Sequence, residues 1–219
     1  MIIEQGTIED LPVILATRQE ASDWLARQGI DQWATAWPSP QAQAERILSS
    51  IRAGETWMVR DDNEASAATV ALDSFSDPRL WTPEEQRQPS MYLHRLIVRR
   101  KYSGFGADVI EWACRRAGEL GNDWVRIDVW TDNIGLHRYY EQQGFRHVRT
   151  LNLSDYPSGA LFQRRAAGRR EARTTSVITE VTHELPTRHH EPEPQRARFG
   201  RHLPQQSPDT SPQAVHRGG

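Results

Sequence analysis

The fold is decided by residues 92–117, YLHRLIVRRKYSGFGADVIEWACRRA, where a strongly apolar run meets two glycines and then a helical pattern. Residues 92–98 have the composition of a buried strand, and apolar side chains recur at helical spacing over 109–120. Gly104 and Gly106 let the backbone approach a ligand closely where a helix begins with unsatisfied N–H groups. Such a turn can simply start a helix, but it is also typical of a phosphate or pyrophosphate site.

A second informative stretch, DVWTDNIGLHRYYEQQGF, covers residues 128–145. It follows a clean alternation of apolar and polar side chains over 124–130, which predicts a strand covered on at least one face. Residues 133–143 predict a short helix, ended by Gly144. Two strand-to-helix units therefore follow one another in the second half of the chain.

The remaining elements follow from the same periodicities. Strands are expected over residues 2–5, 56–60, 67–72, 145–153 and 160–164, and helices over about 10–25 and 40–53. Residues 73–90 contain three prolines and are expected to form a loop. This order predicts an α/β protein with a mixed sheet and helices on its faces.

The paired motifs resemble those of the GNAT superfamily of acyl-CoA-dependent N-acetyltransferases. The matching pieces are the strand YLHRLIV, the turn KYSGFG with its helix, and the block N-x-x-L-x-x-Y-Y-E-x-x-G-F over residues 133–145. The resemblance covers about residues 1–165 and implies a central, mostly antiparallel mixed sheet flanked by about four helices. It also implies transfer of an acetyl group from acetyl-CoA to a primary amine, by direct attack in a ternary complex.

The resemblance implies roles for particular residues. Tyr140 matches the tyrosine that protonates the departing thiolate, and Asn133 the residue that fixes the pantetheine arm. The backbone of Leu96, Ile97 and Val98 would pair with the pantetheine amides and polarise the thioester carbonyl. The pyrophosphate cradle would consist of Lys101, in place of the usual arginine or glutamine, and the amides of Ser103, Gly104, Phe105, Gly106 and Ala107.

The reaction also needs a group that takes a proton from the amine. A primary ammonium with a pKa near ~10 costs about 4 kcal/mol to deprotonate at pH 7. His94, on the central strand, has an ordinary pKa near ~6.5 and is the first candidate for the base. Asp128 on the next strand is the second.

The acceptor is expected to be a small-molecule amine, with a protein N-terminus or lysine as the alternative. Trp24, Trp33 and Trp37 cluster where the chain turns between its first two helices, and they either form an apolar wall for the acceptor or anchor this loop to the core. An alternative function is a non-catalytic CoA-binding or protein-interaction module, because Asp108 lies in the first turn after the glycines and an acid there repels a diphosphate.

Composition excludes several other classes of protein. The 219 residues carry a formal charge of −2, which suggests neither a nucleic-acid partner nor a membrane surface. Cys114 is the only cysteine, expected to be a small core residue, so no disulfide framework and no metal site are expected. No run is long enough to span a membrane, and the expected location is the cytoplasm, as a monomer or homodimer.

The composition changes sharply near residue 166. Residues 166–219 contain six of the thirteen prolines and no tryptophan or tyrosine. So few large apolar groups cannot offset the cost of ordering the backbone, roughly 1–2 kcal/mol per residue. We therefore expect an acyltransferase domain over residues 1–165 and a disordered tail, rich in proline, arginine and histidine, over 166–219.

Overall fold

The computed structural model describes residues 1–34, 39–167 and 178–181. Residues 1–183 belong to one compact unit, and residues 184–219 form a second unit that lies outside the described residues. Most of the predicted tail and Trp37 likewise lie outside them.

Apart from α3 and β8, the helices and strands follow the order that the sequence periodicities predict. The strands are β1 (Ile2–Gln5), β2 (Thr56–Arg60), β3 (Ser66–Asp73), β4 (Ser90–Val98), β5 (Trp124–Val129), β6 (Arg146–Thr150), β7 (Ala160–Arg165) and β8 (Thr179–Val181). The helices are α1 (Leu11–Arg27), α2 (Pro40–Arg52), α3 (Pro83–Gln86), α4 (Gly106–Glu119) and α5 (Ile134–Gln142), with short 3₁₀ turns η1 (Ile8–Asp10) and η2 (Arg100–Tyr102).

The eight strands of the described residues form one mixed sheet in the order β6-β7-β5-β4-β3-β2-β1-β8. Neighbouring strands are antiparallel except for the pairs β4–β5 and β1–β8, which are parallel. The prediction of a mixed, mostly antiparallel sheet is therefore confirmed. The parallel pair β4–β5 lies at the centre of the sheet, between the antiparallel strands β6, β7 and β5 on one side and β4, β3, β2 and β1 on the other.

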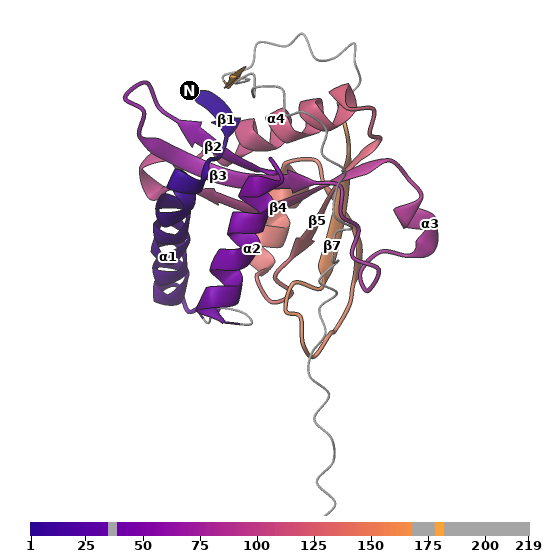
Figure 1. Cartoon of the computed structure of the whole chain (residues 1–219). Coiled ribbons are helices and arrows are strands. Elements are labelled where there is room, and N and C mark those ends of the chain that lie inside the picture. The colour runs from indigo at the N-terminus through magenta and orange to yellow at the C-terminus, as the bar shows by residue number, and fades with distance from the viewer. Residues whose placement is uncertain (35–38, 168–177, 182–219) are drawn as a thin grey trace, which may run out of the picture. The chain divides into compact units, whose positions relative to one another are not determined.

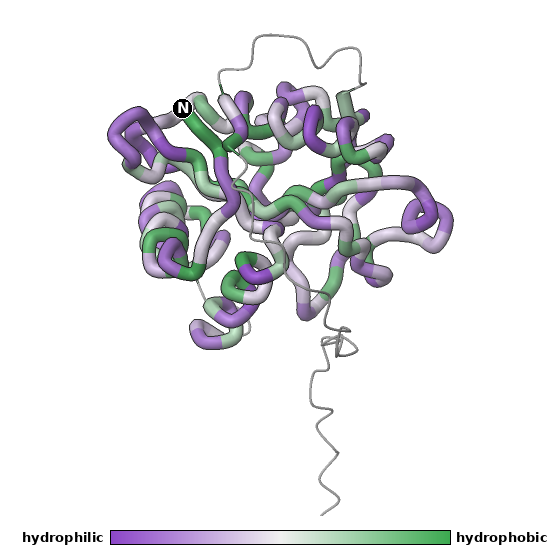
Figure 2. Tube along the Cα trace, turned by 45° about the horizontal axis from the view of Figure 1, so that its top comes forward, coloured by the Kyte–Doolittle hydropathy of each residue, from purple (hydrophilic) through white to green (hydrophobic). Residues whose placement is uncertain are grey.

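Helices cover both faces of this sheet. Figure 1 shows α4 on one face and α1 with α2 on the other. The larger core lies under α4, where Val109, Ala113 and Ala117 pack against Val125 and Ile127 of β5. In Figure 2 hydrophobic residues occur in both strands and helices, while the turn between β2 and β3 is hydrophilic. The alternation predicted for residues 124–130 thus places its apolar side chains under α4.

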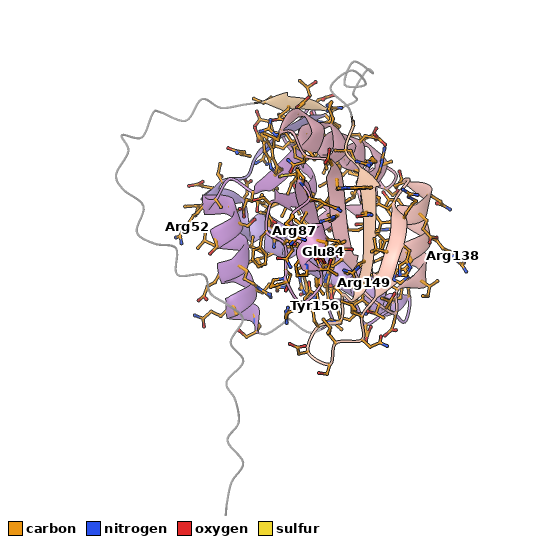
Figure 3. All side chains as sticks on the ribbon, turned by 90° about the vertical axis from the view of Figure 1, so that its right-hand side faces the viewer. Arg52, Glu84, Arg87, Arg138, Arg149 and Tyr156 are labelled. Carbon is orange, nitrogen blue, oxygen red and sulfur yellow. The ribbon has the colours of Figure 1, made fainter. Side chains whose placement is uncertain are left out.

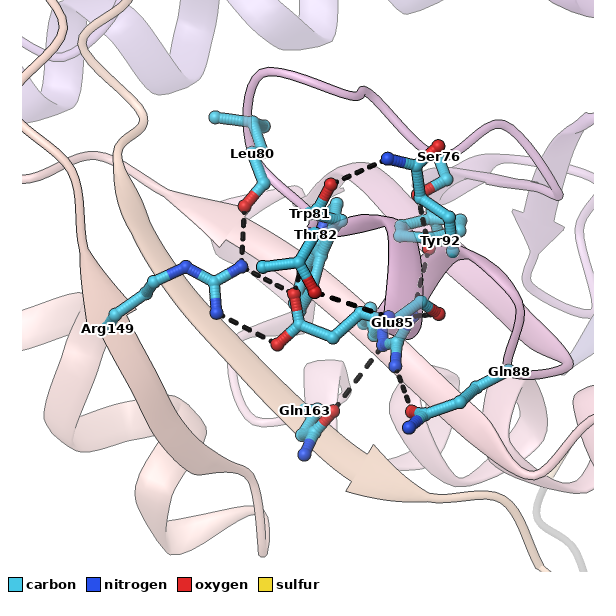
Figure 4. Close-up of polar contacts among 11 residues, drawn as sticks. Ser76, Leu80, Trp81, Thr82, Glu85, Gln88, Tyr92, Arg149 and Gln163 are labelled. Atoms are coloured by element: carbon cyan, nitrogen blue, oxygen red, sulfur yellow. Dashed lines mark hydrogen bonds and ion pairs between the residues drawn. The ribbon is translucent and has the colours of Figure 1, made fainter.

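The segment between β3 and β4 is more ordered than a plain loop. Thr82 caps the single turn of α3, and its backbone N–H donates to Glu85, 2.9 Å away. Arg149 of β6 holds Glu85 through both guanidinium nitrogens and also donates to the Leu80 carbonyl (Figure 4). These hydrogen bonds with Arg149 lower the pKa of Glu85 to about 2. The hydrogen bonds of Arg149 with Glu85 and Leu80 therefore fix the segment that begins directly after Asp73.

A fully buried arginine of β5 also contacts the α3 segment. Arg126 is 0% exposed, donates to the Glu85 carbonyl, and stacks over the Trp81 ring with its guanidinium carbon 4.7 Å from the ring centroid. It also donates to Tyr92 and Gln88 (Figure 4). Buried polar groups must be satisfied in this way, so Arg126 ties the α3 segment to the sheet.

The sheet continues past the expected domain end at residue 165. Strand β8 pairs in parallel with β1, and the preceding Ile178 is only 2% exposed. Glu180 accepts a hydrogen bond from the Trp112 indole at 2.9 Å and forms an ion pair with Arg116 at 3.1 Å. Composition missed this strand because three residues are too few to alter the average of a polar segment.

Candidate active site

The two central strands separate soon after they pair. Only Ser90, Met91 and Tyr92 of β4 have partners on β5, and from Leu93 to Val98 the edge of β4 that faces β5 has no paired strand among the described residues. On its other side β4 stays paired with β3, where Ile97 faces Thr69. The backbone of the predicted residues Leu96 to Val98 therefore lines an opening in the sheet, available to an extended ligand.

A β-bulge lies in β4 beside this opening. The register jumps from Thr69↔Ile97 to Ala71↔His94, so β4 contains one extra residue. Arg95 occupies the bulge with a φ of 50°, a left-handed conformation that costs a side-chain-bearing residue about 1–2 kcal/mol.

The bulge changes which face the neighbouring side chains occupy. Leu93 and Leu96 both pack into the core under α4. His94 stacks on the Tyr92 ring on the opposite face, with the centroids 6.5 Å apart, and Arg95 reaches Ser50 of α2. Two consecutive polar side chains therefore face α1 and α2 at the centre of the sheet.

The glycine turn presents free amides at the start of α4. The backbone N–H groups of Ser103 and Phe105 donate to carbonyls within the turn. No acceptor within residues 1–34, 39–167 and 178–181 takes the N–H groups of Gly104, Gly106, Ala107 or Asp108. These four amides, at the positive end of a helix dipole, can cradle an anion.

The two glycines are needed for different reasons. Gly104 has a φ of 100°, a backbone conformation that L side chains rarely adopt. Gly106 has no such constraint, but a Cβ there would lie 2.4 Å from the hydroxyl oxygen of Tyr139. The second glycine therefore lets α5 pack closely against the start of α4.

The three cationic side chains beside the turn already have contacts within the protein. Arg99 forms an ion pair with Glu20 at 3.2 Å, and the Arg100 guanidinium lies 4.4 Å from the centroid of the Trp24 ring. Lys101 is exposed and donates to the hydroxyl of Tyr102 at 3.3 Å. Exposed contacts of this kind are weak, so Lys101 can turn toward a bound anion.

His94 lies in a row with two carboxylates on the face of α1 and α2. Its Nε2 is 3.6 Å from Asp73 Oδ2, and its Nδ1 is 3.4 Å from Asp128 Oδ1. Burial lowers the pKa of His94, but the hydrogen bonds and charges of Asp128 and Asp73 outweigh it and raise the pKa to about 10. The raised pKa and the two carboxylate partners favour the imidazolium form of His94 at neutral pH, rather than the neutral imidazole that its ordinary pKa suggests.

Asp128 faces the opening from β5. Its side chain is 7% exposed, and Oδ2 accepts a hydrogen bond from the Tyr156 hydroxyl at 2.5 Å. Arg79 packs on the Tyr156 ring with its guanidinium carbon 5.3 Å from the centroid. Figure 3 shows Tyr156 and Arg149 on the side of the sheet turned to the viewer, while Arg52 and Arg138 lie at opposite margins.

Tyr140 of α5 is buried in the core under α4, within electrostatic range of Asp128. The residue is 8% exposed, and burial, together with the neighbouring Tyr139 and Asp128, raises the pKa of its phenol above the ordinary value. In the part of the chain that the structure describes, no group forms a hydrogen bond with its hydroxyl. Tyr140 therefore keeps its proton at neutral pH and has it free to donate.

Asn133 links the start of α5 to the connection after α1. Its Oδ1 caps the helix by accepting from Leu136 N at 3.0 Å, and its Nδ2 donates to Gln32 Oε1 at 2.7 Å. The Trp130 indole donates to Asp31 Oδ1 at 3.1 Å in the same region. These two hydrogen bonds therefore join the connection after α1 to the segment between β5 and α5, and one hydrogen of the Asn133 amide remains for a ligand.

The tryptophans near residue 30 have defined contacts. Trp24 lies under Arg100, and Trp33 lies under Arg18, whose guanidinium carbon is 5.5 Å from the ring centroid. The Trp33 carbonyl accepts from Ser22 at 2.9 Å. These contacts favour the anchoring interpretation for both residues.

Four residues near the opening were not predicted from the sequence: Gln32, Asp73, Arg95 and Tyr156. A signal existed for Arg95, since His94 and Arg95 place two polar residues in succession inside an apolar strand, as a bulge does. No sequence signal pointed to Gln32, because its hydrogen-bond partner Asn133 is 101 residues away.

Other candidate chemistry is limited. Cys114 is fully buried and its pKa is raised to about 12 by burial, in agreement with a core role. Within the described ranges no three His, Cys, Asp or Glu side chains are grouped to hold a metal ion. No described helix is both long and apolar enough to cross a membrane.

Known proteins share this arrangement. The model of the Acetyltransferase (GNAT) family matches residues 18–145. An uncharacterized N-acetyltransferase, YesJ, from Bacillus subtilis (strain 168) is 29% identical over 144 residues, which is 64% of this chain and 78% of that protein.

Solved structures share the fold. A GNAT-family acetyltransferase from Listeria monocytogenes 4b F2365 has a TM-score of 0.63 and 21% identity, covering 75% of this chain and 94% of its own. The PaiA N-acetyltransferase from Thermoplasma acidophilum, solved in complex with coenzyme A, has a TM-score of 0.56 and 16% identity, covering 74% and 97%. With the family model matching more than half of its residues, the chain belongs to the GNAT family and is an N-acetyltransferase.

Proposed function

We propose that this N-acetyltransferase transfers the acetyl group of acetyl-CoA to the primary amine of a small molecule, by direct attack while both are bound. The opening between β4 and β5 carries the proposal. It brings together an unpaired strand edge, the phenol of Tyr140 and the carboxylate of Asp128. Acetyl-CoA would supply a thioester carbonyl open to attack by the amine.

The residues around the opening fit this co-substrate. The edge of β4 at Leu96, Ile97 and Val98 offers backbone partners to the pantetheine amides. The free amides of Gly104, Gly106 and Ala107, joined by Asp108, would hold the pyrophosphate, with Lys101 beside them. In this proposal Ser103 and Phe105 shape the turn and Asn133 orients the pantetheine arm.

Tyr140 is the proposed general acid. Its phenol stays protonated because its pKa is raised, and in this proposal it faces the opening from the side of α4 and α5. It would donate its proton to the sulfur as the bond to the acetyl carbon breaks.

His94 is the proposed base, acting in its neutral form. A pKa of about 10 matches that of a primary ammonium, so the proton moves between them at little cost once His94 is neutral. Reaching that form at pH 7 costs about 4 kcal/mol. The side chain is 26% exposed, which lets the proton pass on to water. Asp128, beside the opening, is the alternative proton acceptor.

The hydrogen bonds between the connection after α1 and the start of α5 favour a small acceptor. The bonds from Gln32 to Asn133 and from Asp31 to Trp130 hold the connection after α1 against the start of α5. In this proposal the connection held in this way limits access to the site, which favours a small amine over a protein segment.

The test is titration of acetyl-CoA into the full chain by calorimetry, followed by an amine panel read out as release of free CoA thiol. The expected result is micromolar binding, roughly −8 kcal/mol, and thiol release that depends on an added amine. Absence of binding, or binding with no amine-dependent release, would contradict the proposal.

A further inference from the structure

Arg95 is a charged side chain that the proposed chemistry does not use. It lies in the β4 bulge, next to the proposed base His94, and its side chain extends across the face covered by α2. Its Nη2 donates to Ser50 Oγ at 2.9 Å, and Ser50 Oγ is also hydrogen bonded to Thr56 Oγ1 at 2.8 Å. The bulge that turns Arg95 to this face needs a positive φ at a residue with a bulky side chain.

The guanidinium has no anion within ion-pair distance in the described part of the chain. Burial lowers the pKa of Arg95, while the charges of Asp73, Glu55 and Asp128 oppose this. Two of those carboxylates, Asp73 and Asp128, are engaged by the imidazolium of His94. A guanidinium remains charged in such a place, and the three carboxylates act on it from beyond ion-pair distance, so a directly bound anion would stabilise it further.

A bound acceptor is a direct source of such an anion. The amine must lie near His94 and the opening, and Arg95 directs its donors along the same face toward α2. A guanidinium presents a fork of N–H groups that matches a carboxylate, and a single bond to Ser50 leaves most of that fork unused. An acceptor with an amine at one end and a carboxylate at the other satisfies both groups.

We propose that Arg95 binds a carboxylate of the acceptor, so that the substrate class is amino acids and related aminocarboxylates. This rests on the function proposed above, since it concerns the acceptor of the same reaction. Arg95 is then a specificity-determining residue that decides which amines are presented at the opening.

The experiment compares matched pairs of amines on the full chain: glycine with methylamine, β-alanine with ethylamine, and 4-aminobutyrate with propylamine. Thiol release gives kcat/KM for each member. At least one carboxylate member is expected to exceed its partner about tenfold or more. In Arg95→Gln that preference should fall at least about tenfold, and Arg95→Lys should retain part of it. Arg52→Gln, which alters an exposed arginine of α2, is the matched control and should keep the wild-type preference.

The outcomes separate the two proposals. If simple amines are acetylated as well as or better than every aminocarboxylate, or if Arg95→Gln lowers both members of a pair equally, the role of Arg95 is overturned while acetyl transfer stands. If no amine is acetylated, the proposed function fails. Calorimetric titration of the aminocarboxylates then decides the role of Arg95: binding that Arg95→Gln removes supports it, and no binding overturns it.

Discussion

At the scale of single residues, His94 determines how the site responds to pH. Its two ring nitrogens each face a carboxylate, Asp73 and Asp128, so both are expected to carry hydrogen. The pKa of His94 in the folded protein, about 10, lies above the ordinary histidine value of ~6.5. The stabilisation from this row is therefore fully present below about pH 6.5 and is lost as the pH rises through about 10.

The protonation state of His94 can be measured directly. In long-range ¹H–¹⁵N spectra we expect the imidazolium signature to persist to above pH 9. In Asp128→Asn the midpoint should move down by at least about one pH unit, because one carboxylate partner is lost. A neutral His94 ring at pH 7.5 in the wild-type chain would contradict the geometry described for this row.

The same pKa gives a kinetic prediction. With an arylamine acceptor, whose own amine does not titrate in this range, kcat/KM should rise about tenfold per pH unit between pH 7 and 9 if neutral His94 is the base. His94→Gln should remove this dependence. A flat profile in the wild-type enzyme would exclude His94 as the base and favour Asp128.

At the scale of elements, the site depends on close packing between α4 and α5. A Cβ on Gly106 would lie 2.4 Å from the Tyr139 hydroxyl oxygen and 3.5 Å from the ring carbon that bears it. Gly106→Ala should therefore destabilise the fold by about 1–3 kcal/mol through overpacking.

A double-mutant cycle isolates that contact. Since only the hydroxyl is too close, Gly106→Ala combined with Tyr139→Phe should recover most of the lost stability in urea unfolding. If the losses from the two substitutions simply add, the requirement for Gly106 lies elsewhere.

The helices and strands of the site could be predicted where the sequence pattern that defines them lies within the element itself. The strand, glycine turn and helix of residues 92–117 follow from apolar periodicity and from the two glycines, and they occur in the structure as β4, η2 and α4. The raised pKa of His94 was not predictable, because it arises from Asp73 and Asp128 on two other strands, whose register no local pattern defines. The bond between Gln32 and Asn133 depends equally on the assembled fold.

At the scale of the whole molecule, the described unit is closed at one sheet edge by a strand from beyond residue 165. β8 covers β1, and Ile178 enters the core with 2% exposure. Burial of one isoleucine contributes about 1.5–3 kcal/mol, and Glu180 adds contacts to Trp112 and Arg116 of α4.

Truncation therefore carries a cost in stability. A chain ending at residue 167 should unfold with a free energy about 2–4 kcal/mol below that of the full chain. Ile178→Ala in the full chain should reproduce most of the loss. Equal urea midpoints for the full and truncated chains would show that β8 contributes nothing to the folded unit.

The central claim is that acetyl transfer takes place at the opening between β4 and β5 with Tyr140 as the proton donor. The most direct measurement is the kcat of Tyr140→Phe, with Tyr139→Phe as the matched control and the acetyl-CoA Kd of each variant measured alongside. We expect Tyr140→Phe to lower kcat at least about tenfold, about 1.4 kcal/mol or more, with Kd nearly unchanged. Tyr139→Phe should change kcat by less than about threefold. An unchanged kcat in Tyr140→Phe across neutral pH would contradict the account.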